Sequence, residues 1–420
     1  MQTHKIIIVG GGAAGFFAAI NAADLAKANN RPVNISILES SDSVLRKVRI
    51  SGGGRCNVTH HQFDVRLFCE NYPRGSKELL SAMQRFQARD TVEWFANRGV
   101  NLVAEEDGRM FPDTNDSNTV IQCFLKATDE LGINVLLNHS VASIERVQAE
   151  NVAPGAGPER FVVSIKDKEP MLADSVMIAT GSSQHGYRFA SALGHTIAEL
   201  APSLFSFKIT DFLLAELPGL SFPNAKVKLL IDGKKPFEEV GPLLITHWGL
   251  SGPGVLKISA WAARDMMHAD YKAKLLVNWL GAKTIEDVIA QIKRLKEQNL
   301  RAQLMNVGPD QVAKRFWVKV LGRSEVSIDK KWTDLSNKEI QKISDTLFRT
   351  EFEVAGKNRY KDEFVECGGV TLKEINFKTM ESKICPGLYF AGEVLDIDGI
   401  TGGFNFQNAW TGGWIAAQNM

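Results

Sequence analysis

A glycine-rich turn close to the N-terminus carries the clearest chemical signal in the sequence. Residues 10–15 read GGGAAG and match the pattern G-x-G-x-x-G. In this pattern Gly10 permits a tight turn, Gly12 lets the backbone approach a pyrophosphate, and Gly15 lets the next helix pack closely. A helix that begins there points unpaired N–H groups and a partial positive charge at the phosphates. The turn therefore predicts a dinucleotide site.

The elements around this turn are those that such a site requires. Residues 6–9 (IIIV) predict a parallel strand that is buried on both faces, residues 13–28 an alanine-rich helix, and residues 34–38 a second strand. Glu39 ends the second strand, where its carboxylate can accept hydrogen bonds from both hydroxyls of an adenosine ribose. The same carboxylate would repel a 2′-phosphate, which disfavours NADP at this site.

A second glycine cluster, residues 51–57 (SGGGRCN), belongs to a basic and glycine-rich segment that we expect to be a loop over residues 46–57. Adjacent glycines expose backbone N–H groups, and basic side chains such as Lys47 supply countercharge for phosphate. A flexible surface loop without a ligand is the alternative interpretation. Cys56 is either a reactive thiol, if Arg55 lowers its pKa, or a small packing residue near the ligand.

Small residues follow two further apolar strands, at 179–181 (ATG) and at 392–393 (GE). Ligands of open α/β sheets lie beyond the carboxyl ends of the strands, so both segments point to the same crevice, where Glu393 could bond a polyol hydroxyl. A final helix is expected from Gln407, after residues 401–406 (TGGFNF). If the pyrimidine end of a flavin lies before that helix, the helix dipole favours the anionic reduced ring.

Composition bounds the kind of protein. A net charge of +1 over 420 residues and 44% hydrophobic residues exclude a disordered or fibrous chain and give no global attraction to nucleic acid or anionic membranes. Five cysteines without a CxxC pair or metal-ligand spacing predict a reducing, cytoplasmic location and no metal site. No window approaches 18 consecutive apolar residues, so no membrane span is expected.

The character of the chain changes after residue 195. Short strands with Pro and Gly punctuation continue to about residue 254, and residues 284–349 have helical periodicity. Thr284 with Asp287, and Ser336 with Glu339, are candidate capping boxes. Strand character returns at residues 351–356. The sequence therefore predicts a strand module and a helical module inserted in the chain.

Motifs along the whole chain resemble one family, the YhiN/BaiN-like flavoproteins, also called aminoacetone-oxidase-like. The resemblance begins with the glycine-rich turn at residues 10–15, called the fingerprint below, and with residues 47 and 51–57. In the family's order there follow residues 108–112 (GRMFP), 246–253 (THWGLSGP), 368–370 (GGV), 391–393 (AGE) and 402–405 (GGFN). The resemblance implies bound FAD and an α/β fold with a discontinuous Rossmann-like FAD-binding domain, residues 1–195 and 366–420. It also implies an inserted β-barrel subdomain, residues 196–256 and 351–365, and a helical subdomain, residues 257–350.

The resemblance also implies where FAD binds. The fingerprint would contact the pyrophosphate, Glu39 the ribose, the backbone of Val141 the adenine, and residues near the C-terminus the ribityl chain and isoalloxazine. One departure from the family pattern is His60, where the family more often has Asn. This difference affects only the last FAD contact that is expected of the loop. Together with the strand ends, the candidate cofactor-binding residues are Gly10, Gly12, Ala14, Gly15, Glu39, Lys47, Ser51, Gly52, Gly54, Arg55, Cys56, Asn57, Val141, Ala179, Thr180, Gly181, Gly392, Glu393, Gly403, Phe404, Asn405 and Phe406.

The leading functional hypothesis is an FAD-dependent oxidoreductase that transfers a hydride between flavin and a small organic substrate. The reaction would be oxidation of an amine or reduction of an activated C=C bond. Because the chain has one G-x-G-x-x-G, NAD(P)H would have to visit transiently as a reductant. His247, in the segment 246–249 (THWG), is the candidate residue to deliver or accept a proton.

Two other classes of function stay open. A flavoenzyme that modifies RNA bases could use residues 290–331, where ten basic and four acidic residues interleave with Phe316, Trp317 and the adjoining Trp332 as stacking platforms. A solvated helical face with core aromatics explains the same residues. The third class is a non-enzymatic flavin-binding sensor. The sequence leaves the substrate and the oligomeric state open.

Overall fold

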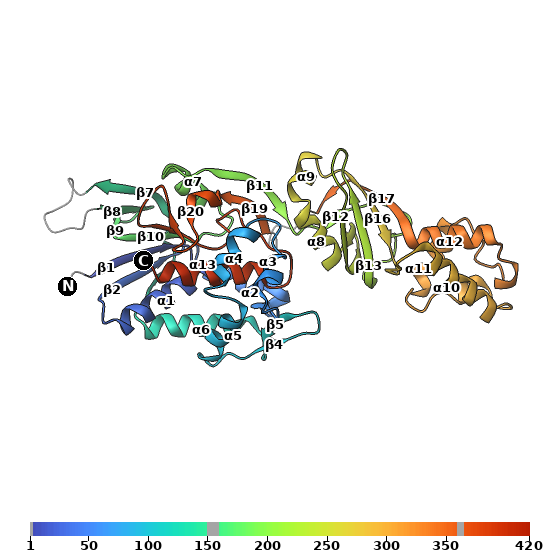
Figure 1. The fold of residues 1–420 in the computed structure, drawn as a ribbon, viewed down its shortest axis with the longest axis horizontal. Helices are drawn as coiled ribbons and strands as arrows, with labels where there is room; N and C mark the ends of the chain where they lie inside the picture. The colour runs from blue at the N-terminus through green and yellow to red at the C-terminus, as the bar shows by residue number, and fades with distance from the viewer. Residues whose placement is uncertain (1–2, 149–158, 359–364) are drawn as a thin grey trace. The chain divides into compact units, whose positions relative to one another are not determined.

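The computed structural model describes residues 3–148, 159–358 and 365–420, and the chain divides into two compact units (Figure 1). Unit 1 comprises Met1–Ala201 and Val365–Met420, and unit 2 comprises Pro202–Phe364. The α/β class with a Rossmann-like domain made of two chain segments is confirmed.

A seven-stranded sheet forms the centre of unit 1, with the strand order β20-β21-β22-β10-β1-β2-β6. The pairs from β22 to β6 are parallel, and Val9 at the end of β1 lies opposite both Leu38 and Ile178. Residues 6–9 are buried, as their apolar character on both faces predicts. Because β22 comes from the C-terminal segment and pairs with β10, both segments of unit 1 share one sheet.

Smaller sheets and helices surround this sheet. The elements of unit 1 are β1 His4–Val9, α1 Ala13–Ala28, β2 Val33–Leu38, α2 Arg46–Gly54, β3 Thr59–His60, α3 Val65–Cys69, α4 Ser76–Met83, α5 Ala88–Ala96, β4 Leu102–Ala104, β5 Arg109–Pro112, α6 Ser117–Glu130, β6 Asn134–Leu136, β7 Val141–Gln148, β8 Glu159–Ile165, β9 Met171–Ala173, β10 Ser175–Ile178, α7 Gln184–Ala192, β11 Ile197–Ser203 (whose last residues enter unit 2), β19 Val365–Val370, η4 Leu372–Glu374, β20 Ile375–Asn376, β21 Glu381–Ser382, β22 Leu388–Phe390 and α13 Phe404–Ala417.

Helices α1 and α13 pack closely against each other. A Cβ atom at Gly413 of α13 would lie 3.0 Å from the carbonyl oxygen of Ala14, so small residues allow the close approach. Helix α13 begins at Phe404, three residues before the predicted start at Gln407. The reason is Gly403, whose φ of +94° lets the chain turn directly into the helix.

Unit 2 contains a seven-stranded sheet that closes on itself. Its order runs β17-β16-β13-β14-β15-β12-β18, and its two outer strands, Thr350–Val354 and Gly356–Lys357, are separated only by Ala355. One continuous stretch of chain therefore pairs with β16 on one side and β12 on the other, which confirms the predicted barrel. The remaining strands are β12 Phe207–Lys208, β13 Ser221–Leu230, β14 Phe237–Thr246, β15 Gly249–Ser251 and β16 Ala273–Asn278.

The other elements of unit 2 are helical. They are α8 Pro253–Trp261, α9 Ala263–His268, α10 Ile285–Gln298, η2 Leu304–Asn306, α11 Lys314–Arg323, η3 Trp332–Asp334 and α12 Asn337–Arg349. Both predicted capping boxes are present, at Thr284 and Ser336. The assignment of all of residues 257–350 to a helical subdomain is wrong at residues 273–278. This apolar stretch pairs with β13 and β17, and a short apolar run cannot be told from a helix by periodicity alone.

Candidate functional site

The three fingerprint glycines are required for different reasons. A Cβ atom at Gly10 would lie 2.5 Å from the Ala179 carbonyl oxygen, and one at Gly15 would lie 2.2 Å from the Gly10 carbonyl oxygen. A Cβ atom at Gly12, in contrast, would meet no protein atom within 4 Å. Gly12 caps α1 without a side-chain hydrogen bond, and the first turn of α1, with Ala14, holds no acidic residue. Open space at an uncapped helix start is what a pyrophosphate requires.

Glu39 lies next to this turn and is held by it. Its Oε2 accepts a hydrogen bond from the backbone N–H of Gly11 (2.9 Å), and its Oε1 accepts one from the N–H of Ser41 (2.9 Å). The Glu39 carbonyl accepts a hydrogen bond from His139 N (2.8 Å), two residues before Val141 at the start of β7. The structure therefore brings the proposed ribose and adenine contacts to the same end of β2.

The second glycine cluster is partly helical. The expectation of a loop over residues 46–57 is wrong for its first part, because Arg46–Gly54 forms α2, anchored by the buried Val48. The helical conformation is lost at Ser51, Gly52 and Gly53, so the glycines remain outside regular structure. A Cβ atom at Gly53 or Gly54 would meet no atom within 4 Å, which leaves room for a ligand along this backbone.

Arg55 and Cys56 do not form a reactive pair. Arg55 pairs with Glu105 (Nη1 to Oε1, 2.6 Å) and lies 3.9 Å above the Phe111 ring, so the protein already neutralises its charge. Burial raises the pKa of the Cys56 thiol to about 12, and a hydrogen bond with Ser51 lowers it by less. Cys56, like the buried Asn57, is therefore a packing residue of the cluster.

We expect Cys56 to resist alkylation by iodoacetamide at about pH 8, where an ordinary thiol with a pKa of about 8.5 reacts. Mass spectrometry of the native protein should find Cys56 unmodified, and protein unfolded in guanidinium should be modified at all five cysteines. The folded thiol holds its proton more tightly than the unfolded thiol. The free energy of unfolding should therefore fall as pH rises from about 9 toward about 12. Rapid labelling of native Cys56 would contradict this assignment.

Glu393 joins three segments that are distant in the sequence. Its Oε2 accepts a hydrogen bond from Lys47 Nζ (2.6 Å), and a Cβ atom at Gly181 would lie 3.6 Å from the same oxygen. Lys47 also lies 3.4 Å from Ser182 Oγ, and a Cβ atom at Gly392 would lie 3.2 Å from the Cβ of Ala14. The ends of β10 and β22 thus converge on the fingerprint and on α2.

The start of α13 is fixed from several sides. A Cβ atom at Gly403 would lie 2.4 Å from the Thr59 carbonyl oxygen, and Tyr72 Oη donates a hydrogen bond to the Phe404 carbonyl (2.6 Å). Asn405 uses its side-chain amide to donate to the Gly399 carbonyl (2.9 Å) and to accept from the Gly399 N–H (2.8 Å). The Asn405 side chain therefore holds the loop before α13, which leaves ligand contacts to the backbone.

His60 takes part in the same loop. Its Nδ1 is hydrogen-bonded to the Gly402 carbonyl (2.9 Å), and its ring stacks on Phe404 at 4.7 Å between centroids. Phe406 stacks on Trp410 (5.5 Å), which turns its ring toward its own helix. The residue at which this chain departs from the family pattern is thus a structural contact of the α13 start.

The residues present fit FAD. The cradle at Gly12 and the open backbone at Gly53 and Gly54 leave space for a dinucleotide, and the first turn of α13 has neither a side-chain cap nor an acidic residue. Thr180 Oγ1, at the end of β10, is buried and has no hydrogen-bond partner among the described residues. The donors at both helix starts match the anionic pyrophosphate and an anionic ring.

The remaining predicted residues lie in unit 2. His247 is exposed in the turn between β14 and β15. Phe316, Trp317 and Trp332 are at most 1% exposed, so the prediction that they could stack on bases is wrong. Their spacing places them on the inner faces of the helices, in the core that also contains Trp279.

Other site residues escaped the sequence-based prediction. Arg74, on the segment before α4, forms a bidentate ion pair with Asp398, which is fully buried and lies 324 residues away. The buried Gln407 accepts hydrogen bonds from Thr59 Oγ1 (2.6 Å) and Thr91 Oγ1 (2.9 Å). Neither contact leaves a periodic signal in the sequence, because both join residues more than 300 positions apart.

Among the described residues, no helix has both the length and the apolar character to cross a membrane. Within the same residues, no three His, Cys, Asp or Glu side chains are grouped so that they could hold a metal ion.

Known proteins resemble this chain over its whole length. Residues 4–419 match the family described as "HI0933-like protein Rossmann domain". A ribosomal RNA dihydrouridine synthase of Haemophilus influenzae is 30% identical over 431 residues, covering 100% of this chain and 99% of that protein. A ribosomal RNA dihydrouridine synthase of Escherichia coli is 26% identical (100% and 98% covered). A 3-dehydro-bile acid delta(4,6)-reductase of Clostridium scindens is 25% identical (99% and 98% covered).

Proposed function

This chain belongs to the HI0933-like family and is an FAD-dependent oxidoreductase, and from that premise we propose that it reduces uracil in ribosomal RNA to dihydrouracil. The observation that carries the proposal is the 30% identity with a ribosomal RNA dihydrouridine synthase across nearly the full length of both chains. Because the chain is an enzyme, it is not the non-enzymatic flavin-binding sensor of the third hypothesis.

The chemistry of the named relatives favours one of the two reactions that the sequence left open. Dihydrouridine formation saturates a C=C bond conjugated to a carbonyl, and so does a reductase of a 3-oxo-4,6-diene. In uracil the hydride adds to C6, the carbon β to the C4 carbonyl, and the proton adds to C5. In the dienone the hydride likewise adds to the far carbon of a double bond conjugated with the carbonyl, and the proton adds to the neighbouring carbon. Reduction of an activated C=C bond is therefore proposed, and amine oxidation is not.

Bound FAD supplies the hydride for this chemistry. The chain's own residues would hold it: the α1 N-terminus and Gly12 would contact the pyrophosphate, and Glu39 would accept from the ribose hydroxyls. Lys47 keeps the Glu393 carboxylate in place (2.6 Å) where it can accept from a polyol hydroxyl. The uncapped start of α13 would stabilise the negative charge that develops on the flavin ring on reduction.

We assign delivery of the proton to His247. Replacing His247 with Gln keeps the size and hydrogen-bonding capacity of the side chain but removes a group that can act as a general acid. General acid catalysis contributes about 10²–10⁴-fold, so the kcat of C=C reduction should fall by at least about 100-fold in H247Q. The rate of flavin bleaching by NADH, followed by stopped-flow absorbance, should not change. Full turnover in H247Q with bound, reducible FAD would refute the assignment.

The proposed function is tested on unmodified ribosomal RNA transcribed in vitro. The RNA is incubated anaerobically with the FAD-loaded enzyme and NADH or NADPH, then digested to nucleosides for mass spectrometry. We expect bleaching of the flavin by a reduced nicotinamide and a gain of two mass units in uridine. Bleaching without dihydrouridine would refute RNA as the substrate, and no bleaching would refute the nicotinamide as the electron donor.

A second candidate substrate is a small conjugated enone. It is favoured by the 25% identity with a 3-dehydro-bile acid delta(4,6)-reductase, which spans 99% of this chain. The same anaerobic assay with a 3-oxo-4,6-diene steroid in place of RNA separates the two candidates. Faster reoxidation of the reduced flavin by the steroid than by RNA would favour the small-molecule candidate.

A further inference from the structure

We propose that ribosomal RNA docks on a basic strip of unit 1 that consists of two neighbouring hollows on either side of the turn at residues 383–385. The first hollow is lined by Lys373, Lys378 and Lys383, and the second by Arg146 and Arg188. The strip binds the phosphodiester backbone of the RNA. This inference rests on the proposed function, because it names the surface through which that substrate is held.

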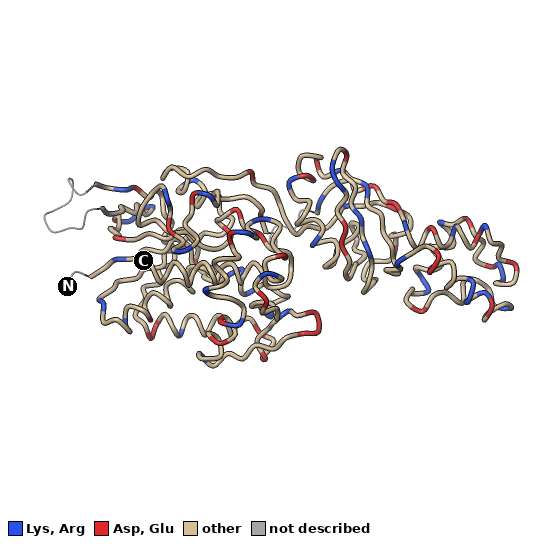
Figure 2. The backbone as a smooth tube through the Cα atoms, in the orientation of Figure 1, with Lys and Arg blue, Asp and Glu red and all other residues tan. Residues whose placement is uncertain are grey.

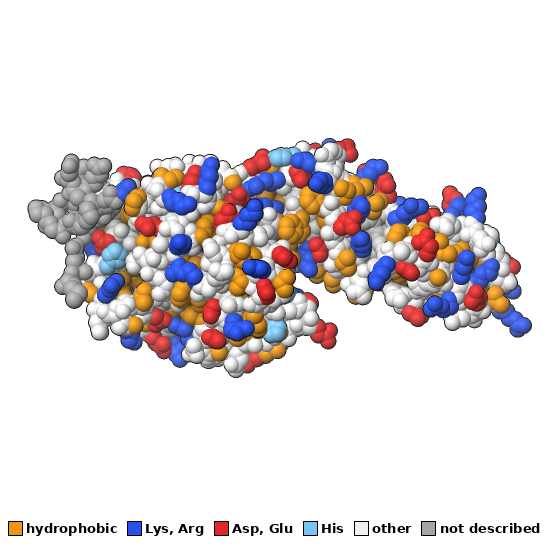
Figure 3. Space-filling model, viewed as in Figure 1, with side chains coloured by type: hydrophobic (Ala, Val, Ile, Leu, Met, Phe, Trp, Pro, Cys, Tyr) orange, Lys and Arg blue, Asp and Glu red, His pale blue; other side chains and the backbone are white. Residues whose placement is uncertain are grey.

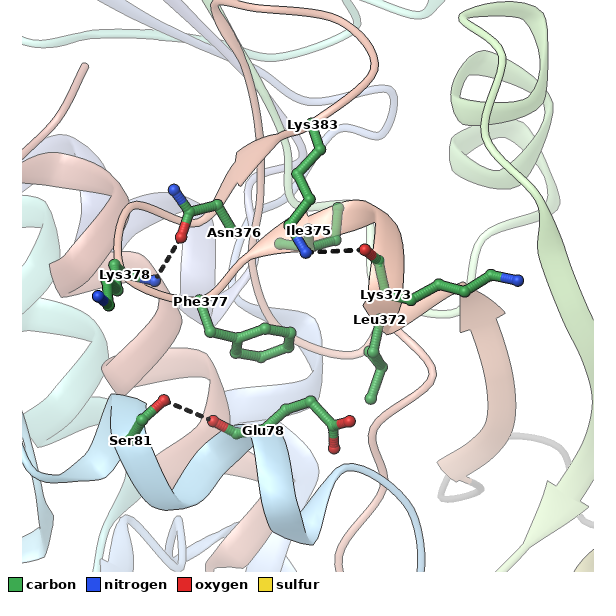
Figure 4. A pocket seen from close by; sticks show the side chains of 9 residues that line it. All are labelled: Glu78, Ser81, Leu372, Lys373, Ile375, Asn376, Phe377, Lys378 and Lys383. Atoms are coloured by element: carbon green, nitrogen blue, oxygen red, sulfur yellow. Dashed lines mark hydrogen bonds between the residues drawn. The ribbon is translucent and has the colours of Figure 1, made fainter.

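The first hollow, of about 360 Å³, lies between α4 and the segment from η4 to β21 (Figure 4). Lys383 Nζ donates to the Lys373 carbonyl (2.8 Å). Arg85, two residues after the end of α4, donates to the Lys378 carbonyl. Phe377 lines the hollow, and Glu78 is the acidic residue that lines it. Three lysines thus line a hollow that contains one carboxylate.

The second hollow, of about 800 Å³, begins where the first ends. Ile384 and Cys385, which follow Lys383, line it together with β7 and the second half of α7. Arg188 is exposed there and is hydrogen-bonded to His185 (2.7 Å). This contact does not neutralise the positive charge of Arg188. Two hollows that lie next to each other along one turn can bind an extended polyanion better than a single phosphate group.

Glu78 lines the first hollow and the exposed Glu145 lines the second, but two acidic residues close to the lysines in sequence make contacts within the protein. Glu374, next to Lys373, is hydrogen-bonded to His195 (3.1 Å) and accepts from the Thr196 N–H (3.0 Å). Glu381 accepts from the Gly387 N–H (2.8 Å). In the part of the chain that the structure describes, no carboxylate lies within 4 Å of the amino groups of the three lysines. Their charge is therefore available to phosphate.

The helical part of unit 2 is a poorer RNA surface than its composition suggests. Lys319 pairs with Glu216 (3.5 Å), Arg323 with Asp211 (2.7 Å), and Lys330 with Glu339 (2.8 Å). Helices α10 and α12 carry both acidic and basic residues, whereas α11 carries basic residues only (Figure 2), and both kinds of side chain are mixed on the visible face of this region in Figure 3. With its aromatics buried and three of its cations already paired, this region lacks the stacking platforms and part of the free charge that the RNA hypothesis assigned to it.

The strip is connected to the flavin-site residues by the backbone. Val370, directly before the η4 segment, donates to the Val394 carbonyl (2.9 Å), and its own carbonyl accepts from Asp396 N (3.1 Å). Val394 follows Glu393, so the lysine-bearing segment extends from a strand that flanks the site. Helix α4, on the other side of the first hollow, packs on α13.

The test compares three FAD-loaded proteins: the wild type, the strip variant K373Q/K378Q/K383Q, and the control variant K27Q/K166Q/K168Q. The control removes three exposed lysines of unit 1 that lie outside the strip. Binding of fluorescently labelled, unmodified ribosomal RNA is measured by anisotropy over a range of salt concentrations. Each lost phosphate contact reduces the magnitude of the slope of log K against log salt by about 0.7–0.9. The slope of the strip variant should therefore be smaller in magnitude by roughly 2 to 3.

The control variant should keep the wild-type slope, and all three proteins should be bleached by NADH at the same rate. A wild type that forms dihydrouridine beside a strip variant with an unchanged slope would overturn the strip and leave the proposed function standing. A wild type that neither binds the RNA nor forms dihydrouridine would overturn the proposed function, and the strip with it.

Discussion

Replacing Gly12 with alanine is expected to weaken FAD binding about 10- to 100-fold without lowering the stability of the apo protein. The backbone at Gly12 is extended (φ −95°, ψ −170°), which alanine adopts readily, and the added Cβ would meet no protein atom within 4 Å. It would instead occupy the space assigned to the pyrophosphate. A loss of 10- to 100-fold corresponds to about 1.4–2.8 kcal/mol, in the range that overpacking costs.

The measurement is a fluorescence titration of apo protein with FAD, together with a thermal melt of the apo protein. Gly15→Ala is the matched comparison, because its Cβ would lie 2.2 Å from the Gly10 carbonyl oxygen. That variant should lose both FAD affinity and apo stability. Wild-type affinity in G12A would mean that the pyrophosphate does not lie in this cradle.

Replacing Arg74 with methionine should produce the largest loss of stability in unit 1. Asp398 is fully buried, and Arg74 forms a bidentate ion pair with it, with a side chain that is 14% exposed. Removing one partner of a buried ion pair costs about 3–5 kcal/mol, because the other charge stays buried without that countercharge. For a unit of this size, that cost lowers the melting temperature by about 10 °C.

Differential scanning calorimetry of the FAD-loaded protein measures this loss. The control is Lys126→Met, which breaks the exposed ion pair between Lys126 and Glu130 on α6 and should cost no more than about 0.5 kcal/mol. Equal melting temperatures for R74M and K126M would show that the buried pair does not stabilise unit 1.

The parts of the site that could be predicted from the sequence are those set by local rules. The strand before Gly10, the helix after Gly12 and the acid at Glu39 follow from a pattern whose members lie within about one βαβ unit. The capping boxes at Thr284 and Ser336 are local in the same way, because an N-cap and the residue three positions later determine them.

The missed features depend on partners that are distant in the sequence. The ion pairs of Lys47 with Glu393 and Arg74 with Asp398 each join residues more than 300 positions apart, and no periodicity marks either partner. Residues 273–278 form a strand because β13 and β17 lie on either side of them. The prediction that Trp317 could stack on bases is wrong because neighbours in the sequence are not neighbours in space. The basic residues next to Trp317 lie on the other face of its helix.

The two-segment construction of unit 1 has a consequence for synthesis on the ribosome. Strand β10 is complete at residue 178, but its partner β22 begins at residue 388. At about 5–20 residues per second, β10 waits roughly 10–40 s for β22, and α1 waits longer for α13. During that interval the nascent sheet has an open edge, which invites wrong pairing. Unit 2 is continuous in sequence and can fold meanwhile, so chaperones are needed most for the N-terminal segment.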